Sequence, residues 1–242
     1  MIFRGIVLRT VKYRDAELIV DIFTLSHGRL SFVTHVSHSS RKSSQGASFW
    51  RPLNLLEFEA ELPVPAARRL PRPKDVRVYE NYADIPYNPV KSTLALFLSE
   101  FLSNVLRDTQ SDATLYNYIE YSLRWLDAAD HHLANFHLVF MMQLTRLVGI
   151  YPNLSDYTSR RFFDLVAGTY CTQQPSHSSF LPPYEAQLLP MLFRMNFTNM
   201  HLFRFSRQQR WRCLEVINQY YCVHFPQFPQ LRSISVLREV FD

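Results

Sequence analysis

Three histidines of this 242-residue sequence lie close enough together to suggest a metal centre, namely His131, His132 and His137. Imidazole nitrogen is a common zinc ligand. Adjacent histidines point to different sides of a helix, however, and no carboxylate falls on the same face one turn later. The spacing is typical of the solvated start of a helix, so the sequence predicts no metal ligands here.

The thiols and the carboxylates give no chemical site either. Cys171, Cys213 and Cys222 are odd in number and have no paired spacing, which argues against a disulfide framework and a zinc site. Three acidic residues near the N-terminus alternate in a strand-like segment beside arginines, so we expect them to form cross-strand charge pairs: Asp15, Glu17 and Asp21.

Motifs of catalysis are missing from the sequence. Its five glycines are too scattered for a phosphate-binding loop, no serine has a nucleophile-elbow context, and no His-Glu pair resembles a metalloprotease site. We therefore predict a protein that is not an enzyme, with no catalytic residue, no cofactor and no small-molecule substrate.

Charge is distributed very unevenly along the chain. The net charge is +5, and Met1 to Glu80 contain 13 of the 26 basic residues but only 8 of the 21 acidic ones. The whole positive excess thus lies in the first third of the sequence. This asymmetry favours a polyanionic partner for the N-terminal region.

The elements that must carry these basic residues are short strands. Residues 3–9, 18–23, 30–36, 53–61 and 76–79 have β-rich composition or period-two alternation, and Gly28 suits a tight hairpin. The segments 37–48 and 63–74 read as exposed basic loops. Five short strands with long loops are typical of a small barrel, of which the OB-fold is the commonest.

After residue 82 the periodicity becomes helical. Apolar residues at spacings of three and four predict helices over 90–107, 113–128, 133–148, 184–195, 206–223 and 231–241, with Asp112 as an N-cap. An irregular insert at about 150–183 contains a short strand over 160–165 and a turn at 167–169. The predicted class is α+β: an OB-fold-like β-barrel (1–82) followed by an all-α helical domain (83–242).

Neither a membrane span nor a signal peptide is expected. No run of about 18 apolar residues occurs, and the first residues alternate basic and apolar side chains. We therefore expect a cytoplasmic protein.

Two segments carry a family resemblance. Residues 6–30 (IVLRTVKYRDAELIVDIFTLSHGRL) resemble the opening of the RecO family of bacterial recombination mediators, which has an I/V-V-L-R-T segment, an acidic turn and F-T-x-x-x-G-x-L. Residues 203–205 (FRF) and 231–239 (LRSISVLRE) resemble the closing segments of that family. Many members also hold four cysteines as a zinc ribbon after a segment like 147–154. This chain has only Cys171 there, so we predict that the zinc ribbon is lost and that aromatic packing shapes the insert.

The resemblance implies a mediator that binds single-stranded DNA, anneals complementary strands and helps to load the RecA recombinase with RecR and single-stranded-DNA-binding protein. It would act at the nucleoid. Basic residues would bind phosphates and an aromatic residue would stack on bases. The candidate DNA-binding residues are Arg9, Lys12, Arg14, Arg41, Lys42, Trp50, Arg51, Arg68, Arg69, Arg72 and Lys74.

A second candidate site lies in the helical region. Arginines beside aromatic residues suit the acidic, hydrophobic-ended C-terminal tail of single-stranded-DNA-binding protein. The candidate residues are Phe203, Arg204, Arg207, Arg210, Trp211 and Arg212. The alternative is a protein–protein adaptor whose basic barrel does not bind DNA directly.

Overall fold

The computed structural model describes residues 1–35, 47–62 and 69–240, and these form two compact units. The first unit comprises Met1–Ala128 together with Leu231–Val240, and the second comprises Ala129–Gln230. The predicted domain boundary at residue 82 therefore differs from the division between units, because the first two helices pack with the sheet. The prediction of domains 1–82 and 83–242 stays a prediction.

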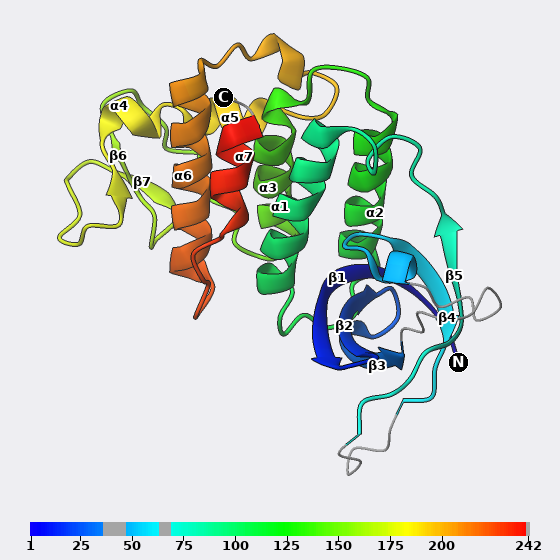
Figure 1. Cartoon of the computed structure of the whole chain (residues 1–242). Coiled ribbons are helices and arrows are strands. Elements are labelled where there is room, and N and C mark those ends of the chain that lie inside the picture. Colours follow the sequence, from blue (N-terminus) through cyan, green and yellow to red (C-terminus); the bar gives the residue numbers. More distant parts are fainter. Residues whose placement is uncertain (36–46, 63–68, 241–242) are drawn as a thin grey trace. The chain divides into compact units, whose positions relative to one another are not determined.

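An antiparallel sheet of five strands forms the N-terminal part of the first unit, as predicted (Figure 1). Its strand order is β3-β2-β1-β4-β5. The strands are β1 (Ile2–Arg14), β2 (Glu17–Thr24), β3 (Gly28–His35), β4 (Leu55–Glu59) and β5 (Lys74–Glu80), and a 3₁₀ turn, η1 (Ala47–Trp50), precedes β4. The α+β class is confirmed.

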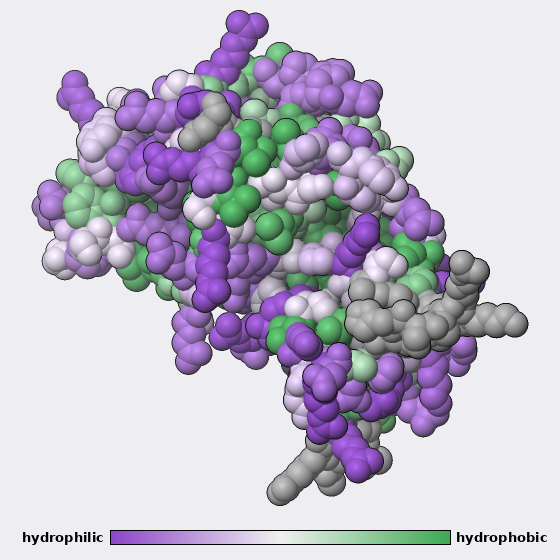
Figure 2. Space-filling model, in the orientation of Figure 1, coloured by the Kyte–Doolittle hydropathy of each residue, from purple (hydrophilic) through white to green (hydrophobic). Residues whose placement is uncertain are grey.

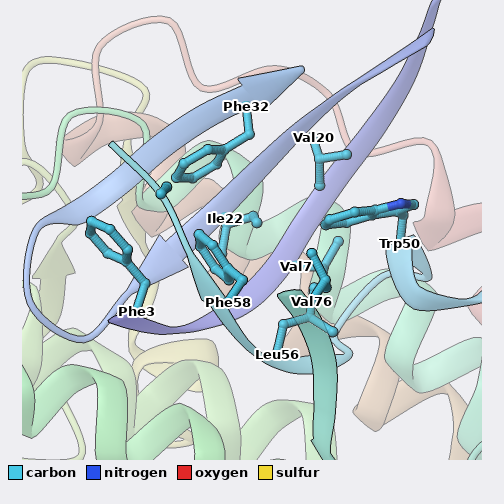
Figure 3. Close-up of a cluster of buried hydrophobic side chains, with 10 residues drawn as sticks. Phe3, Val7, Val20, Ile22, Phe32, Trp50, Leu56, Phe58 and Val76 are labelled. Atoms are coloured by element: carbon cyan, nitrogen blue, oxygen red, sulfur yellow. The ribbon is translucent and has the colours of Figure 1, made fainter. Parts of the chain in front are cut away.

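The sheet curls because β1 carries two bulges where it pairs with β2. The register slips between Val7 and Arg9 and again between Lys12 and Arg14, which leaves Leu8 and Tyr13 as the extra residues. Bulges bend a strand and increase its twist. The sheet buries a core of alternate strand residues together with Trp50 from η1 (Figure 3). The strand residues include Phe3, Val7, Val20, Ile22, Phe32, Leu56, Phe58 and Val76.

The predicted OB-fold-like barrel is an OB-like sheet that is not closed as a barrel. Among the described residues, β3 and β5 share no ladder, and a backbone hydrogen bond of 3.0 Å from the Val33 amide to the Pro71 carbonyl joins β3 to the segment before β5. Pro71 and Pro73 lack N–H groups, so this segment cannot supply the alternating donors that a ladder needs. The prolines therefore explain why the sheet stays open there.

Two helices complete the main part of the first unit, α1 (Pro89–Val105) and α2 (Ala113–Ala128), close to their predicted ranges. The Asn88 side chain caps α1, and Asp112 accepts bonds from the amides of residues 114 and 115, as predicted for an N-cap. Gly28 has a φ of +68° and its turn lies against the loop between the helices, so the predicted hairpin glycine is confirmed.

Helix α7 (Ser233–Val240) belongs to the first unit although it follows the second in sequence. It packs beside α1 (Figure 1). The Glu100 carboxylate on α1 accepts hydrogen bonds from the amides of Arg232 (2.9 Å) and Ser233 (2.8 Å) and from the Ser233 hydroxyl. A helix N-terminus leaves amides without helical acceptors, and this carboxylate satisfies two of them.

The second unit is mainly helical around α3 (Phe136–Leu147), which is buried along most of its length and follows the 3₁₀ turn η2 (Leu133–Asn135). Its other helices are α4 (Pro183–Ala186), α5 (Leu189–Arg194), the 3₁₀ turn η3 (Met200–Leu202) and α6 (Arg207–His224). The predicted helix 184–195 is thus two short helices, and Pro190 at the start of α5 fits a helix beginning there. No described helix is long and apolar enough to cross a membrane.

The insert forms a small sheet of three strands, β6 (Phe162–Asp164), β7 (Thr169–Cys171) and β8 (Phe180–Leu181), in the order β7-β6-β8. The strand β6 and the turn at Gly168 agree with the predicted strand 160–165 and turn 167–169, whereas β7 and β8 were not predicted. Phe163 and Leu165 are fully buried. From α6, the Tyr220 hydroxyl donates to the Ile150 carbonyl (2.9 Å) and His224 Nε2 lies 2.9 Å from the Leu165 carbonyl.

In the described part of the chain, no group of three His, Cys, Asp or Glu side chains could hold a metal.

Candidate nucleic-acid interface

Three carboxylates on the strands of the first unit each bind two arginines. The first is Glu57 on β4, which lies directly opposite Arg4 on β1 and Arg77 on β5 in the ladders. Arg4 Nε lies 3.2 Å from one carboxylate oxygen, and Arg77 binds the other. The hydrogen bonds from Arg77 and Arg4 hold the pKa of Glu57 below its ordinary value, so this carboxylate is ionised at neutral pH.

The second carboxylate, Asp21 on β2, is almost completely buried. Its Oδ2 accepts bonds from Arg9 (3.1 Å) and Arg29 (2.8 Å), and its Oδ1 accepts one from the Ser31 hydroxyl (2.5 Å). Arg29 also donates to the Ser103 carbonyl on α1 (2.7 Å). Burial raises the pKa of Asp21, but the hydrogen bond from Ser31 and the charges of the two arginines outweigh it, and the pKa is lower than usual.

The third carboxylate is Glu17, at the start of β2. Arg72, in the segment before β5, binds one of its oxygens at 2.6 Å, and Arg14, at the end of β1, lies 3.6 Å from the other. The Arg14 guanidinium also lies over the ring of Tyr13, 5.0 Å from its centroid. Both arginine side chains are more than half exposed, so their charges face solvent.

The ratio of two arginines to one carboxylate leaves a net charge of +1 on each group. Five of the six arginines are more than half exposed, and Arg29 is the exception at 13%. Hydrophilic side chains predominate over the strands on the face seen in Figure 2. The carboxylates therefore orient the guanidinium groups without cancelling their charge, and five of these six arginines keep their side chains at the surface.

The remaining predicted DNA-binding residues have three different outcomes. Lys12, Arg51 and Arg69 are exposed, and none makes an ion pair with any residue that the structure describes. Lys74 lies 3.6 Å from Glu61, and both side chains are largely exposed. Arg41, Lys42 and Arg68 lie outside the described residues.

Trp50 requires a correction. Its side chain is only 2% exposed and packs in the core of the sheet, as the close-up shows (Figure 3), so it cannot stack on a base. Residue type and a neighbouring basic loop suggested an exposed ring, but the side chain at the end of η1 turns inward. Tyr13, in contrast, is 53% exposed.

Sequence reasoning did not assign Arg4 and Arg77 to the interface. They are separated from each other by more than 70 residues, and only the strand register brings both to Glu57. The sequence signal was the Arg-x-Tyr-Glu ending of β5 beside an acidic β4, which predicts cross-strand pairs but not their register.

The predicted peptide site in the second unit is partly occupied by internal contacts. Arg212 binds Glu185 at 2.5 and 3.0 Å, and Arg210 donates to the Asn135 side chain (3.2 Å) and the Phe205 carbonyl (3.3 Å). These two arginines therefore hold the fold of the unit. Arg204 and Arg207 are exposed, and Phe203 and Trp211 are half-buried.

The structure thus defines an α+β protein in which an OB-like, arginine-rich sheet precedes a helical region. The family model for the N-terminal part of recombination protein O matches residues 1–80, and the model for its C-terminal part matches residues 86–232. The chain belongs to the RecO family, and its role lies in DNA repair and recombination.

Relatives of the same length support this assignment. The chain is 44% identical to the DNA repair protein RecO of Phocaeicola vulgatus over 238 residues, which cover 98% of both chains. It is 43% identical to the DNA repair protein RecO of Bacteroides fragilis, again over 98% of both, and 33% identical to that of Flavobacterium psychrophilum over 99% of this chain and 98% of the relative.

Proposed function

We propose that this protein is a recombination mediator that binds single-stranded DNA through the arginine-rich surface of its sheet. The observation that carries the proposal is the ratio of two arginines to one carboxylate at Glu57, Asp21 and Glu17. Guanidinium groups fixed in this way bind phosphate oxygens without reading a base sequence. Membership of the RecO family supports the same proposal.

Annealing follows from the same electrostatics. Two complementary strands repel each other through their phosphates, and a surface that neutralises part of this charge lets them approach. Binding releases counterions, so affinity should fall steeply as the salt concentration rises. We propose that the protein anneals strands in this way and assists RecA loading together with RecR and single-stranded-DNA-binding protein.

We further propose that the acidic tail of single-stranded-DNA-binding protein binds the second unit through its exposed arginines. Arg204 and Arg207 are exposed near the start of α6, and the half-buried Phe203 and Trp211 lie close to them in sequence. Arg210 and Arg212 are held by internal partners and act by shaping the surface. The whole role requires binding and no bond-making step, so we propose that the protein is not an enzyme and that it works in the cytoplasm on nucleoid DNA.

A salt titration with a matched control tests DNA binding. The triple variant Arg4→Gln, Arg9→Gln and Arg77→Gln removes three exposed arginines from the groups around Glu57 and Asp21. If all three contact phosphates, the slope of log affinity against log salt for a labelled oligo-dT should decrease by about 2, because each single-strand contact contributes about 0.7.

The control is Arg124→Gln on α2. Arg124 lies 2.5 Å from both Glu80 and Glu120, so its surroundings are net negative, and its loss should leave the slope unchanged. Equal slopes for the triple variant and the wild type would reject the proposed surface. Wild-type protein that fails to bind oligo-dT at low salt, yet still binds RecR, would favour the protein–protein adaptor.

A further inference from the structure

A β-bulge presents an aromatic ring at the tip of the β1–β2 hairpin. Lys12 pairs with Leu18 and Arg14 with Glu17, so β1 has one more residue than β2 across this step, and that residue is Tyr13. A bulged residue is left out of the pairing and its side chain is aimed away from the regular pleat. The sheet core does not need this ring, because Tyr13 is 53% exposed whereas the core aromatic residues are buried.

One face of the ring is already occupied by a cation. The Arg14 guanidinium lies over it at 5.0 Å from the centroid, a distance at which a cation is attracted to the π-face. Arg14 in turn contacts Glu17, which also binds Arg72. The tip therefore combines an exposed aromatic ring with two guanidinium groups, both held by one carboxylate, in a group with a net charge of +1.

This combination matches the two parts of a nucleotide. An unpaired base offers a flat π-surface that stacks on an aromatic ring, and its phosphate accepts charge-assisted bonds from arginine. A duplex hides its base faces, so a stacking ring selects for single strands. The inference rests on the proposed function, since it assumes that the basic surface of the sheet binds nucleic acid.

We propose that the bulge at Tyr13 is a nucleotide subsite: the ring stacks on one unpaired base, while Arg14 and Arg72, oriented by Glu17, bind the adjacent phosphate. The subsite takes any base, because stacking depends on the π-face and the arginines contact only the backbone. It gives the interface a preference for single strands that the charge of the surface alone would not provide.

The test compares Tyr13→Ala with Tyr13→Phe and with the control Tyr87→Ala, a substitution at a tyrosine that is 81% exposed in the same unit. Binding of a labelled oligo-dT is measured across a range of salt concentrations. Tyr13→Ala should weaken binding roughly five- to 150-fold, the effect of losing one base stack, with an unchanged salt slope. Tyr13→Phe and Tyr87→Ala should bind like the wild type.

An abasic oligonucleotide supplies a readout that a general loss of fold would not produce. The wild type and Tyr13→Ala should bind it equally, because no base is present to stack. The variant Arg14→Gln with Arg72→Gln should lower the salt slope by about 1.4 on both oligonucleotides, if each arginine contributes about 0.7.

The two proposals fail in different ways. If the wild type binds oligo-dT in a salt-dependent manner and Tyr13→Ala binds it equally well, the subsite is wrong and the proposed function stands. If the wild type shows no binding to either oligonucleotide, the proposed function fails and the subsite fails with it.

Discussion

Asp21 is the most buried of the three carboxylates that bind two arginines. We predict that the stability of the sheet depends on it more than on the other two, and Asp21→Asn tests this. The side chain is 3% exposed, and its oxygens accept bonds from Arg9, Arg29 and Ser31. Asparagine keeps the size but removes the negative charge and turns one acceptor into a donor that faces arginine. The half-buried Arg29 is then left without a counter-charge.

The expected loss in the free energy of unfolding is large for a substitution as small as Asp21→Asn. Breaking a buried ion pair by removing one partner destabilises a protein by about 3–5 kcal/mol. Typical domains unfold with a free energy of about 5–15 kcal/mol, so the variant should lose a fifth or more of a typical value. Glu57→Gln is the matched comparison, since Glu57 also binds two arginines. Those two arginines are mostly exposed, solvent screens their charges, and the cost should be far smaller.

Urea unfolding, followed by tryptophan fluorescence, measures the difference. Trp50 and Trp125 lie in the first unit and Trp211 in the second, so a Trp211→Phe background restricts the signal to the first unit. Asp21→Asn should unfold at a clearly lower urea concentration than Glu57→Gln. If the two variants unfold at the same midpoint, the argument from burial is refuted.

Acid should reveal the same interaction. The pKa of Asp21 is lower in the folded protein than its ordinary value, so its stabilisation is present above the unfolded pKa and is lost as the pH falls through the folded pKa. The wild type should therefore lose stability below about pH 4, the ordinary pKa region of aspartate, and Asp21→Asn should lack this component. Urea midpoints between pH 3 and pH 7 measure it.

Three further variants test other parts of the first unit. Gly28→Ala should destabilise the first unit by roughly 1–3 kcal/mol because of the left-handed φ alone. The loss should be larger still because the new Cβ would lie 2.3 Å from the Thr109 carbonyl oxygen, and thermal unfolding measures it. Glu100→Gln should loosen the start of α7, seen as faster amide hydrogen exchange in α7 but not in α2. Lys91 is buried, lies 2.7 Å from Asp84 and also donates to the Asp127 carbonyl. Lys91→Met should be tolerated better than Asp84→Ala, which leaves the buried cation without a counter-charge. A lower melting temperature for Lys91→Met would contradict this.

Much of the fold is predictable from periodicity. The five N-terminal strands, the glycine at the hairpin and the cap at Asp112 follow from local patterns, because alternation, positive φ and capping act over a few residues. The open edge of the sheet also has a local cause in Pro71 and Pro73. Two prolines spaced two residues apart indicate that this segment cannot donate the hydrogen bonds of a ladder. A count of strands predicts a small barrel but does not show where its sheet stays open.

The interface is less predictable because it depends on register. Glu57 accepts a hydrogen bond from Arg4, which lies 53 residues away in the sequence. No local sequence pattern indicates that one carboxylate binds two arginines. The direction of a side chain is equally non-local: Trp50 and Tyr13 are both aromatic residues beside basic ones, yet the first fills the core and the second lies at the surface. The charge excess could be predicted from the sequence, but its arrangement could not.

The return of α7 to the first unit has a consequence for synthesis on the ribosome. The sheet and α1 emerge early, but α1 must wait for α7 until the roughly 100 residues of the second unit have been translated, about 5–20 s at ordinary rates. During that interval the apolar side of α1 that α7 later covers is open to chaperones or to other nascent chains. The native topology is therefore completed late, by a segment that closes over a surface made first.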